Sequence, residues 1–280
     1  MKIKKISLVI LMIGFIGFSY LIYQKGTFKV GLKPIHSESA ILIDTNGKTV
    51  ASKRKNKKIK PASLAKMMTA ILVLEKVDTI HKYVTVDNEL VSQLQSSGAS
   101  MAGFKPGSQV TIRELLYGLM LPSGADAAVS LAIAISGSEE QFVADMNAKA
   151  KELGMMHTHF TNSYGMDDAN QYSTVADLGL LANYALKDGD FRAIFTSKSF
   201  QDERFVFYST VFEKFGDTSL KNGELLGGKT GYTDEAGLCL ASLAIVDGKE
   251  YILVSVGAKG DHDTEQFNMT DAKTIYNSLS

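Results

Sequence analysis

A serine and a lysine three residues apart form the pair whose spacing could produce a nucleophile. Ser63 and Lys66 stand at the start of an apolar run, 67–74, that is typical of a buried helix, and Pro61 favours a helix start there. On one helical turn the hydroxyl and the amine share a face. The amine can accept the hydroxyl proton if burial or a second cation keeps it neutral. The helix N-terminus would stabilise negative charge that develops nearby.

The same tetrapeptide pattern has a purely structural interpretation. Ser-x-x-Lys occurs by chance in many chains, and a helix cap followed by a surface lysine produces it as well. The remaining residues of the chain have to decide between these two interpretations.

The other reactive side chains predict no second site. His81, His157 and His159 are not at metal-ligand spacing, and the last two are interpreted as structural, while His262 is expected in an exposed turn. Cys239, the single cysteine, lies in an apolar run and is expected to be a buried small hydrophobic residue. The sequence shows no residues that can be recognised as a Ser-His-Asp triad. We therefore predict neither a metal nor a cofactor.

The composition limits the class of protein. A chain of 280 residues can bury a large core in one or two domains. Lys+Arg and Asp+Glu both number 30, so the net charge is zero and nothing indicates a nucleic-acid partner. A single cysteine excludes an internal disulfide.

The N-terminus has the features of a membrane segment. Lys2, Lys4 and Lys5 precede an uncharged stretch, 6–23, which as a helix would be roughly 27 Å long and just able to span a bilayer. We predict an anchor at 1–23, a tether at 24–36 and a folded domain at 37–280 outside the cytoplasmic membrane. The alternative is a cleaved signal peptide, although no A-x-A cleavage site is visible.

Strands are predicted at both ends of the folded part. Asn46-Gly47 lies between the apolar runs 40–44 and 48–51, which is a strong hairpin pattern. The basic run that follows, 53–60, is interpreted as a solvated loop, with anionic lipid or wall polymer as the alternative partner. Three further strands are expected near 225–232, 238–246 and 251–256, before a closing helix at 264–279.

The middle of the chain is predicted to be helical. Capping-box patterns begin at Thr111, Ser138 and Thr174, and an apolar segment at 127–135 adds another helix. Residues 78–110 have a mixed, loop-rich pattern, and residues 199–211, where the chain returns to strands, alternate loosely. The expected fold class is α+β, an antiparallel sheet formed by both ends of the chain with an inserted helical region.

Three short motifs, in order, resemble those of a known family. They are Ser63-Leu64-Ala65-Lys66, Ser123-Gly124-Ala125 and Lys229-Thr230-Gly231. In order, spacing and flanking residues they are similar to the motifs of the serine D-alanyl-D-alanine carboxypeptidases, the low-molecular-mass penicillin-binding proteins, which share a fold with serine β-lactamases. The resemblance covers about residues 38 to 260. It implies a β-lactamase/transpeptidase-like fold.

The resemblance implies a role for each residue of an acyl-transfer site. Ser63 would attack the carbonyl of the penultimate D-alanine, and Lys66 would be the general base. Ser123 would relay a proton to the leaving D-alanine. The backbone N–H groups of Ser63 and Tyr232 would form the oxyanion hole, where each donor is typically worth about 3 kcal/mol.

The third motif would bind the substrate. Lys229 and Thr230 would meet the terminal carboxylate, and Lys229 would help to keep Lys66 neutral. Gly231 has no side chain, so that a peptide or a penicillin could lie along its strand. The implied partners are peptidoglycan pentapeptide as substrate, β-lactams as covalent inhibitors, and the cytoplasmic membrane through the N-terminal helix.

One position departs from the family pattern. The second motif usually ends in asparagine, which offers an amide to the substrate, whereas this chain has Ala125. Either another side chain replaces that amide, or the enzyme is slower or differs in substrate preference. Asp126 follows directly and is expected to point elsewhere.

Other functions remain open on this sequence. A serine β-lactamase is disfavoured because no glutamate between Ser123 and Lys229 has Leu or Asn three residues later. A transpeptidase is a further alternative, and a non-catalytic penicillin-sensing or wall-peptide-binding ectodomain is another. Only 49 residues follow Gly231, so a single domain outside the membrane is expected.

Overall fold

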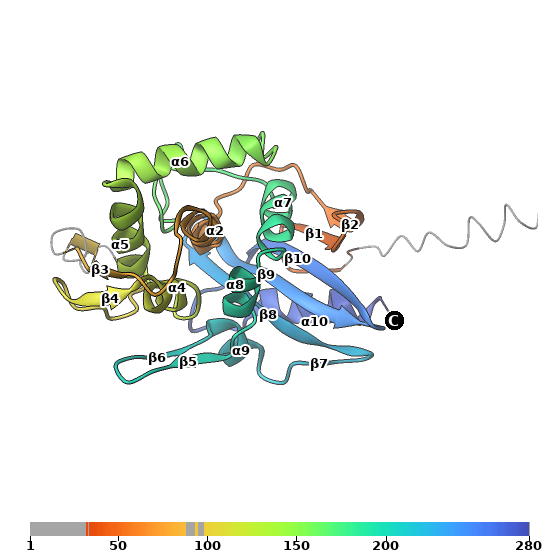
Figure 1. Cartoon of the computed structure of the whole chain (residues 1–280). Helices are drawn as coiled ribbons and strands as arrows, with labels where there is room; N and C mark the ends of the chain where they lie inside the picture. Colours follow the sequence, from red (N-terminus) through yellow and green to blue (C-terminus); the bar gives the residue numbers. More distant parts are fainter. Residues whose placement is uncertain (1–31, 33, 88–92, 95–97, 280) are drawn as a thin grey trace, which may run out of the picture. The chain divides into compact units, whose positions relative to one another are not determined.

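The two ends of the folded part of the chain meet in one antiparallel sheet, as the sequence predicts (Figure 1). The computed structural model describes residues 32, 34–87, 93–94 and 98–279. The sheet has the strand order β2-β1-β10-β9-β8-β7, and each neighbouring pair is antiparallel. The strands are β1 (Ser39–Asp44), β2 (Thr49–Lys53), β7 (Ser219–Leu220), β8 (Gly223–Thr233), β9 (Gly237–Val246) and β10 (Lys249–Ala258). The α+β fold class is confirmed.

Local turn chemistry joins these strands. In the turn between β1 and β2, the Asp44 carboxylate accepts backbone hydrogen bonds from Asn46 and Lys48 at 3.0 and 2.9 Å. Between β9 and β10, Asp247 and Gly248 both have positive φ, 48° and 71°. Positive φ at both central residues gives the turn a twist that matches the twist of paired strands.

A buried helix, α2 (Lys66–Lys76), lies at the centre of the helical region. Its residues from Lys66 to Val73 are all buried. It contacts α4 (Ile112–Met120), α5 (Ala125–Ser136), α6 (Glu139–Glu152) and α7 (Val175–Ala185), and Figure 1 shows it enclosed by them. A helix that is apolar on every side is stable only in such surroundings.

The predicted helix starts are present. Thr111 and Glu114 form a complete capping box at the start of α4. The side chains of Ser138 and Thr174 accept backbone hydrogen bonds at the starts of α6 and α7. These caps satisfy N–H groups that have no partner within the helix.

The mixed segments contain short elements that periodicity could not resolve. Residues 199–208 form a separate hairpin of β5 (Ser199–Gln201) and β6 (Val206–Tyr208). A second small hairpin joins β3 (Tyr83–Thr85) to β4 (Gln109–Thr111). Two unpredicted helices are α8 (Gly189–Phe195) and α9 (Thr210–Phe215), and α10 (Phe267–Asn277) begins three residues later than expected. Elements of three to seven residues are too short for a periodic pattern.

The start of the folded part is fastened to α10. The buried Asp271 carboxylate accepts hydrogen bonds from the backbone N–H groups of His36 and Ser37 at 2.8 and 2.6 Å. From Leu32 onward the chain forms one compact unit. The predicted anchor at 1–23 lies outside the described residues. Within the residues that are described, no helix is long and apolar enough to cross a membrane.

Candidate active site

Ser63 and Lys66 lie in hydrogen-bonding contact. Ser63 is in a 3₁₀ turn, η1 (Ala62–Ala65), that leads into α2. The Lys66 amine donates hydrogen bonds to Ser63 Oγ at 2.9 Å and to the Tyr164 carbonyl at 2.7 Å. Lys66 is only 2% exposed. Because the amine is buried with two oxygens as partners, the interpretation of Lys66 as a surface lysine is wrong.

Burial also changes the proton affinity of both lysines. Desolvation lowers the pKa of Lys66 to about 7, against a smaller opposing effect of the Asp126 charge. Burial lowers the pKa of Lys229 well below its ordinary value, and the nearby Lys66 charge lowers it further. A neutral amine at near-neutral pH is the form that can accept a proton. The sequence predicts burial or a second cation as the cause, and burial has the larger effect on both lysines.

Ser123 links the second motif to the third. Lys229, which is fully buried on β8, donates hydrogen bonds to Ser123 Oγ and to the Thr230 carbonyl, both at 2.8 Å. Ser123 itself has a φ of +69°, a conformation that costs energy for a residue other than glycine. It lies in the tight connection between α4 and α5. Pro122, just before Ser123, is incompatible with a continuation of α4.

One small cavity brings the predicted residues together. Ser63, Ser123, Thr230, Gly231 and Tyr232 all line a space of about 60 Å³. The structure thus brings the hydroxyls of both serines to the edge of β8, while Lys66 and Lys229 are buried beside them.

Two glycines allow the backbone near Ser63 to pack tightly. A Cβ on Gly231 would lie 3.2 Å from the backbone nitrogen of Ser63. A Cβ on Gly165, whose φ is +89°, would lie 2.0 Å from the Ala62 carbonyl oxygen. Ala62 also has a positive φ, 46°. This packing brings the Ser63 nitrogen against β8, next to the strand position of Tyr232.

Several residues of the cavity were missed by the sequence analysis. Thr210, the first residue of α9, shares a 2.7 Å hydrogen bond with the Thr230 hydroxyl. Lys214 in α9 is within hydrogen-bonding distance of His262 Nδ1, at 3.3 Å, and donates to Gln266 at 3.2 Å. His262 was expected in an exposed turn, which is correct, but it also lines the cavity. No motif marks α9, so only the fold brings it to the site.

Position 125 does not face the cavity. Ala125 is fully buried and packs with Leu94 and Val129. Asp126 is also fully buried and accepts hydrogen bonds from the backbone N–H groups of Ala102 and Gly103, both at 2.8 Å. Asp126 therefore points away from the serines, as expected.

The remaining candidates have structural positions. Cys239 is buried, and desolvation raises the pKa of its thiol to about 12, so that a small hydrophobic role is confirmed. His159 forms a bridge with Tyr172 through backbone hydrogen bonds. Among the described residues, no cluster of histidine, cysteine or carboxylate side chains could hold a metal ion.

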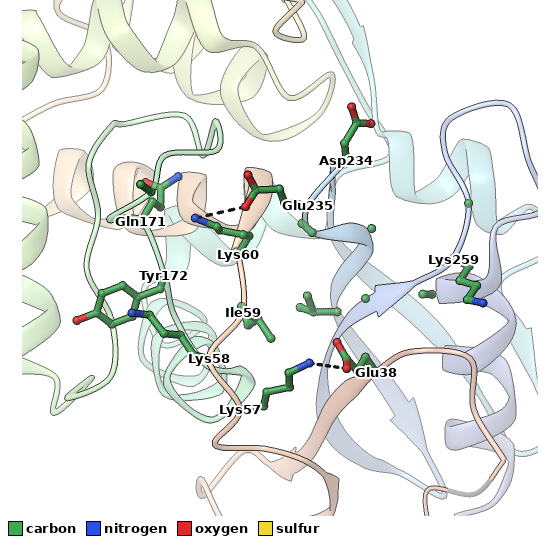
Figure 2. A pocket seen from close by; sticks show the side chains of 17 residues that line it. Glu38, Lys57, Lys58, Ile59, Lys60, Gln171, Tyr172, Asp234, Glu235 and Lys259 are labelled. Carbon is green, nitrogen blue, oxygen red and sulfur yellow. Dashed lines mark hydrogen bonds and ion pairs between the residues drawn. The ribbon is translucent and has the colours of Figure 1, made fainter.

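A larger cavity, of about 610 Å³, lies beyond the end of β8 (Figure 2). Its walls include residues 57–60, from the basic run, and residues 234–237. Lys57 pairs with Glu38, and the Lys60 amine is 3.5 Å from Glu235, as the dashed lines in Figure 2 mark. Neither Ser63 nor Ser123 lines this cavity. Lys57 and Lys60, from the basic run, thus each lie close to a carboxylate at this cavity.

Comparisons with known proteins agree with this geometry. The sequence model of the D-alanyl-D-alanine carboxypeptidase family matches residues 27–260. The chain is 33% identical to DacF of Bacillus subtilis over 79% of its own length, and 33% identical to DacA of Escherichia coli over 76%. Both are named D-alanyl-D-alanine carboxypeptidases, and the matches cover 57% and 54% of them. The chain thus spans little more than half the length of these relatives.

A solved structure shares the fold. The crystal structure of the Streptomyces K15 DD-transpeptidase matches with a TM-score of 0.78 and 27% identity, over 87% of this chain and 97% of that one. The family match covers all three motifs, from Ser63 to Gly231. The chain therefore belongs to the D-alanyl-D-alanine carboxypeptidase family.

Proposed function

We propose that this chain is a serine D,D-carboxypeptidase that removes the terminal D-alanine from peptidoglycan pentapeptides through an acyl-enzyme. The observation that carries the proposal is the buried Lys66 amine, 2.9 Å from Ser63 Oγ and with its pKa lowered to about 7. In its neutral form this amine can accept the serine proton, which makes the hydroxyl oxygen nucleophilic.

The first half of the reaction forms an ester. Ser63 Oγ attacks the carbonyl of the penultimate D-alanine while its proton moves to Lys66. The backbone N–H groups of Ser63 and Tyr232 stabilise the oxyanion. Ser123 delivers its proton to the leaving amine, so that the C–N bond breaks and free D-alanine departs. The proton held by Lys66 then passes to the Ser123 oxygen, which returns both Ser123 and Lys66 to their starting states. Lys229 supports this step because it donates to Ser123 Oγ at 2.8 Å.

The second half releases the shortened peptide. Lys66, neutral again, accepts a proton from a water molecule that attacks the ester carbonyl. The C–O bond to Ser63 then breaks, the Ser63 oxygen takes the proton back from Lys66, and the shortened peptide leaves with a new carboxyl group. In the first half, the terminal carboxylate of the substrate lies at Thr230 and Lys229, of which Thr230 lines the cavity and Lys229 is buried beside it. Gly231 leaves the strand edge open to a peptide backbone.

The intact mass of the full-length protein, measured after mixing with benzylpenicillin, tests this proposal. We expect a lasting adduct on the wild type and none on Ser63→Ala, followed by D-alanine release when the wild type meets a wall pentapeptide. Continuous loss of penicillin without an adduct would indicate a β-lactamase instead. Neither adduct nor turnover would favour the non-catalytic alternative and refute the proposal.

A transpeptidase is the second candidate, favoured by the likeness to the Streptomyces K15 DD-transpeptidase structure. In that case an amine in place of water takes the acyl group from Ser63. Adding an acceptor amine such as glycine to the pentapeptide assay separates the two functions. A carboxypeptidase releases mainly tetrapeptide, whereas a transpeptidase forms mainly the glycine conjugate.

We infer that the catalytic domain, 37–280, works outside the cytoplasmic membrane, with 24–36 as tether and 1–23 as anchor. Support comes from Lys2, Lys4 and Lys5, which precede an uncharged stretch. Protease treatment of intact spheroplasts should digest the domain, and washing with carbonate should leave it in the membrane fraction. A protein recovered free in the medium with a shortened N-terminus would indicate a cleaved signal peptide.

A further inference from the structure

The second motif has alanine, Ala125, where the family pattern has asparagine, and neighbouring side chains pack against this position. Ala125 packs under Leu94 and beside Val129, with Met101 and Tyr164 against the same cluster. Ala125 is 0% exposed. Ala125 does not line the cavity of Ser63 and Ser123, and its methyl group offers no polar atom to a substrate bound there.

Two sets of contacts fasten residues 100–104 over this position. The Ala125 backbone N–H donates to the Ser100 carbonyl at 2.7 Å. The Asp126 carboxylate accepts hydrogen bonds from the backbone of Ala102, Gly103 and Phe104 at 2.8, 2.8 and 3.0 Å. A buried carboxylate with three such donors holds this segment firmly against the start of α5.

A glycine in the second motif makes this contact possible. A Cβ on Gly124 would lie 2.6 Å from the Cβ of Ala102, closer than real Cβ contacts allow. The middle residue of the motif is thus as much a contact for residues 100–104 as a link between Ser123 and α5.

This arrangement places Ser100, which is exposed, at the catalytic cavity. Ser100 lines the cavity together with Ser63, Pro122 and Ser123, as do Thr230 and Gly231 of β8. A peptide that lies along β8 turns half of its backbone N–H and C=O groups towards this opposite wall. A serine hydroxyl can donate to one such group or accept from it.

We propose that Ser100 makes the polar contact with the acyl half of the substrate that the asparagine of the second motif makes in relatives. The inference rests on the proposed function, since it assigns a specificity-determining residue to the same site. Ser100 is not a member of any of the three motifs, and its place depends on Asp126.

The test uses the full-length protein and three variants, Ser100→Ala, Ser100→Thr and Ser108→Ala. Ser108 is the matched control because its hydroxyl binds the Lys105 carbonyl and does not line the cavity. The measurements are kcat and KM for D-alanine release, the rate of acylation by benzylpenicillin, and the melting temperature.

We expect Ser100→Ala to lower kcat/KM about tenfold, as the loss of one hydrogen bond predicts, without a change in melting temperature. Ser100→Thr keeps the hydroxyl and should recover most of the rate, and Ser108→Ala should match the wild type. If Ser100→Ala equals the wild type, or loses stability together with rate, the inference is wrong while the proposed function stands. If the wild type itself forms no adduct at Ser63, the proposed function fails first.

Discussion

At the scale of single residues, the site depends on what burial does to an amine. Lys66 sits with Ser63 Oγ and the Tyr164 carbonyl as its hydrogen-bond partners and is 2% exposed. Burial penalises the ammonium form and so lowers its pKa to about 7, which makes the neutral base available under ordinary conditions. The same lysine in water would be protonated almost completely at neutral pH.

The pH dependence of acylation follows from this pKa. Lys66 must be neutral to accept the Ser63 proton, so the acylation rate should rise with pH up to about 7 and then level off. Below that point the rate should fall roughly tenfold per pH unit. The measurement is benzylpenicillin acylation by intact mass between pH 5 and 9. A rate that is independent of pH across this range would contradict Lys66 as the base.

Gly165, which packs against the residue before Ser63, offers a second test. Gly165→Ala would bring a Cβ to 2.0 Å from the Ala62 carbonyl and push Ser63 from its place, so acylation should fall at least about a hundredfold. Gly137→Ala is the matched control, because Gly137 also has a positive φ, 83°, but no atom within 4 Å of the added Cβ. Gly137→Ala should lose about 1–2 kcal/mol of unfolding free energy, Gly165→Ala should lose more because of the added clash, and only Gly165→Ala should lose acylation in its folded form.

At the scale of elements, the start of α5 both begins a helix and holds a neighbouring segment of the chain in place. Its first two residues are buried, Ala125 under the segment 99–101 and Asp126 with its carboxylate bound to the backbone of residues 102–104. The helix therefore fixes one wall of the catalytic cavity. The opposite wall is the edge of β8, and η1 lies between them, in contact with β8.

The burial of this helix start predicts the effect of Ala125→Asn. Ala125 is fully buried in a cluster with Leu94 and Val129, so a larger polar side chain there must displace its neighbours. We expect a loss of about 1–3 kcal/mol in the free energy of urea unfolding and slower acylation, because residues 100–104 are displaced. Ala169→Asn, at an exposed position, is the control. A variant as stable as the wild type, with faster acylation, would contradict this account.

At the scale of the whole molecule, the central sheet is complete only because strands from both ends of the folded part pair with each other. β1 pairs with β10 in register from Ser39 with Val256 to Asp44 with Tyr251. Asp271 on α10 then holds His36 and Ser37 just before β1 through their backbone N–H groups. The N-terminal entry and the C-terminal helix are thereby joined by one buried carboxylate.

Removing that carboxylate should weaken the whole fold but not the chemistry. Asp271→Ala leaves the buried N–H groups of His36 and Ser37 without their acceptor, which should cost about 2–4 kcal/mol of unfolding free energy. Such a loss lowers the melting temperature of a domain of this size by roughly 4–16 °C. Calorimetry measures it, and Asp263→Ala, in an exposed turn, is the control. Acylation at low temperature should remain close to the wild-type rate. An unchanged melting temperature would refute this role for Asp271.

The sequence by itself determined the local features. The Thr111 cap, the Asn46-Gly47 and Asp247-Gly248 turns and the alternation of strands with helices all depend on neighbours within a few residues. The order of the three motifs was enough to identify the family and the α+β fold. Short elements such as α8 and α9 escaped because their sequences carry no periodic pattern.

Only the tertiary structure decided how the site is completed. Three features of the site depend on segments that are far apart in the sequence. Lys66 and Lys229 are both buried, and Thr210 contacts Thr230. Ser100, rather than residue 125, lines the cavity. Burial, and the pKa shifts it causes, depends on everything that packs around a group, so a motif names the residue but not its protonation state. The physical reason is that a motif specifies residues close together in the sequence, whereas the desolvation of a side chain and the distance to its partners depend on the complete tertiary structure.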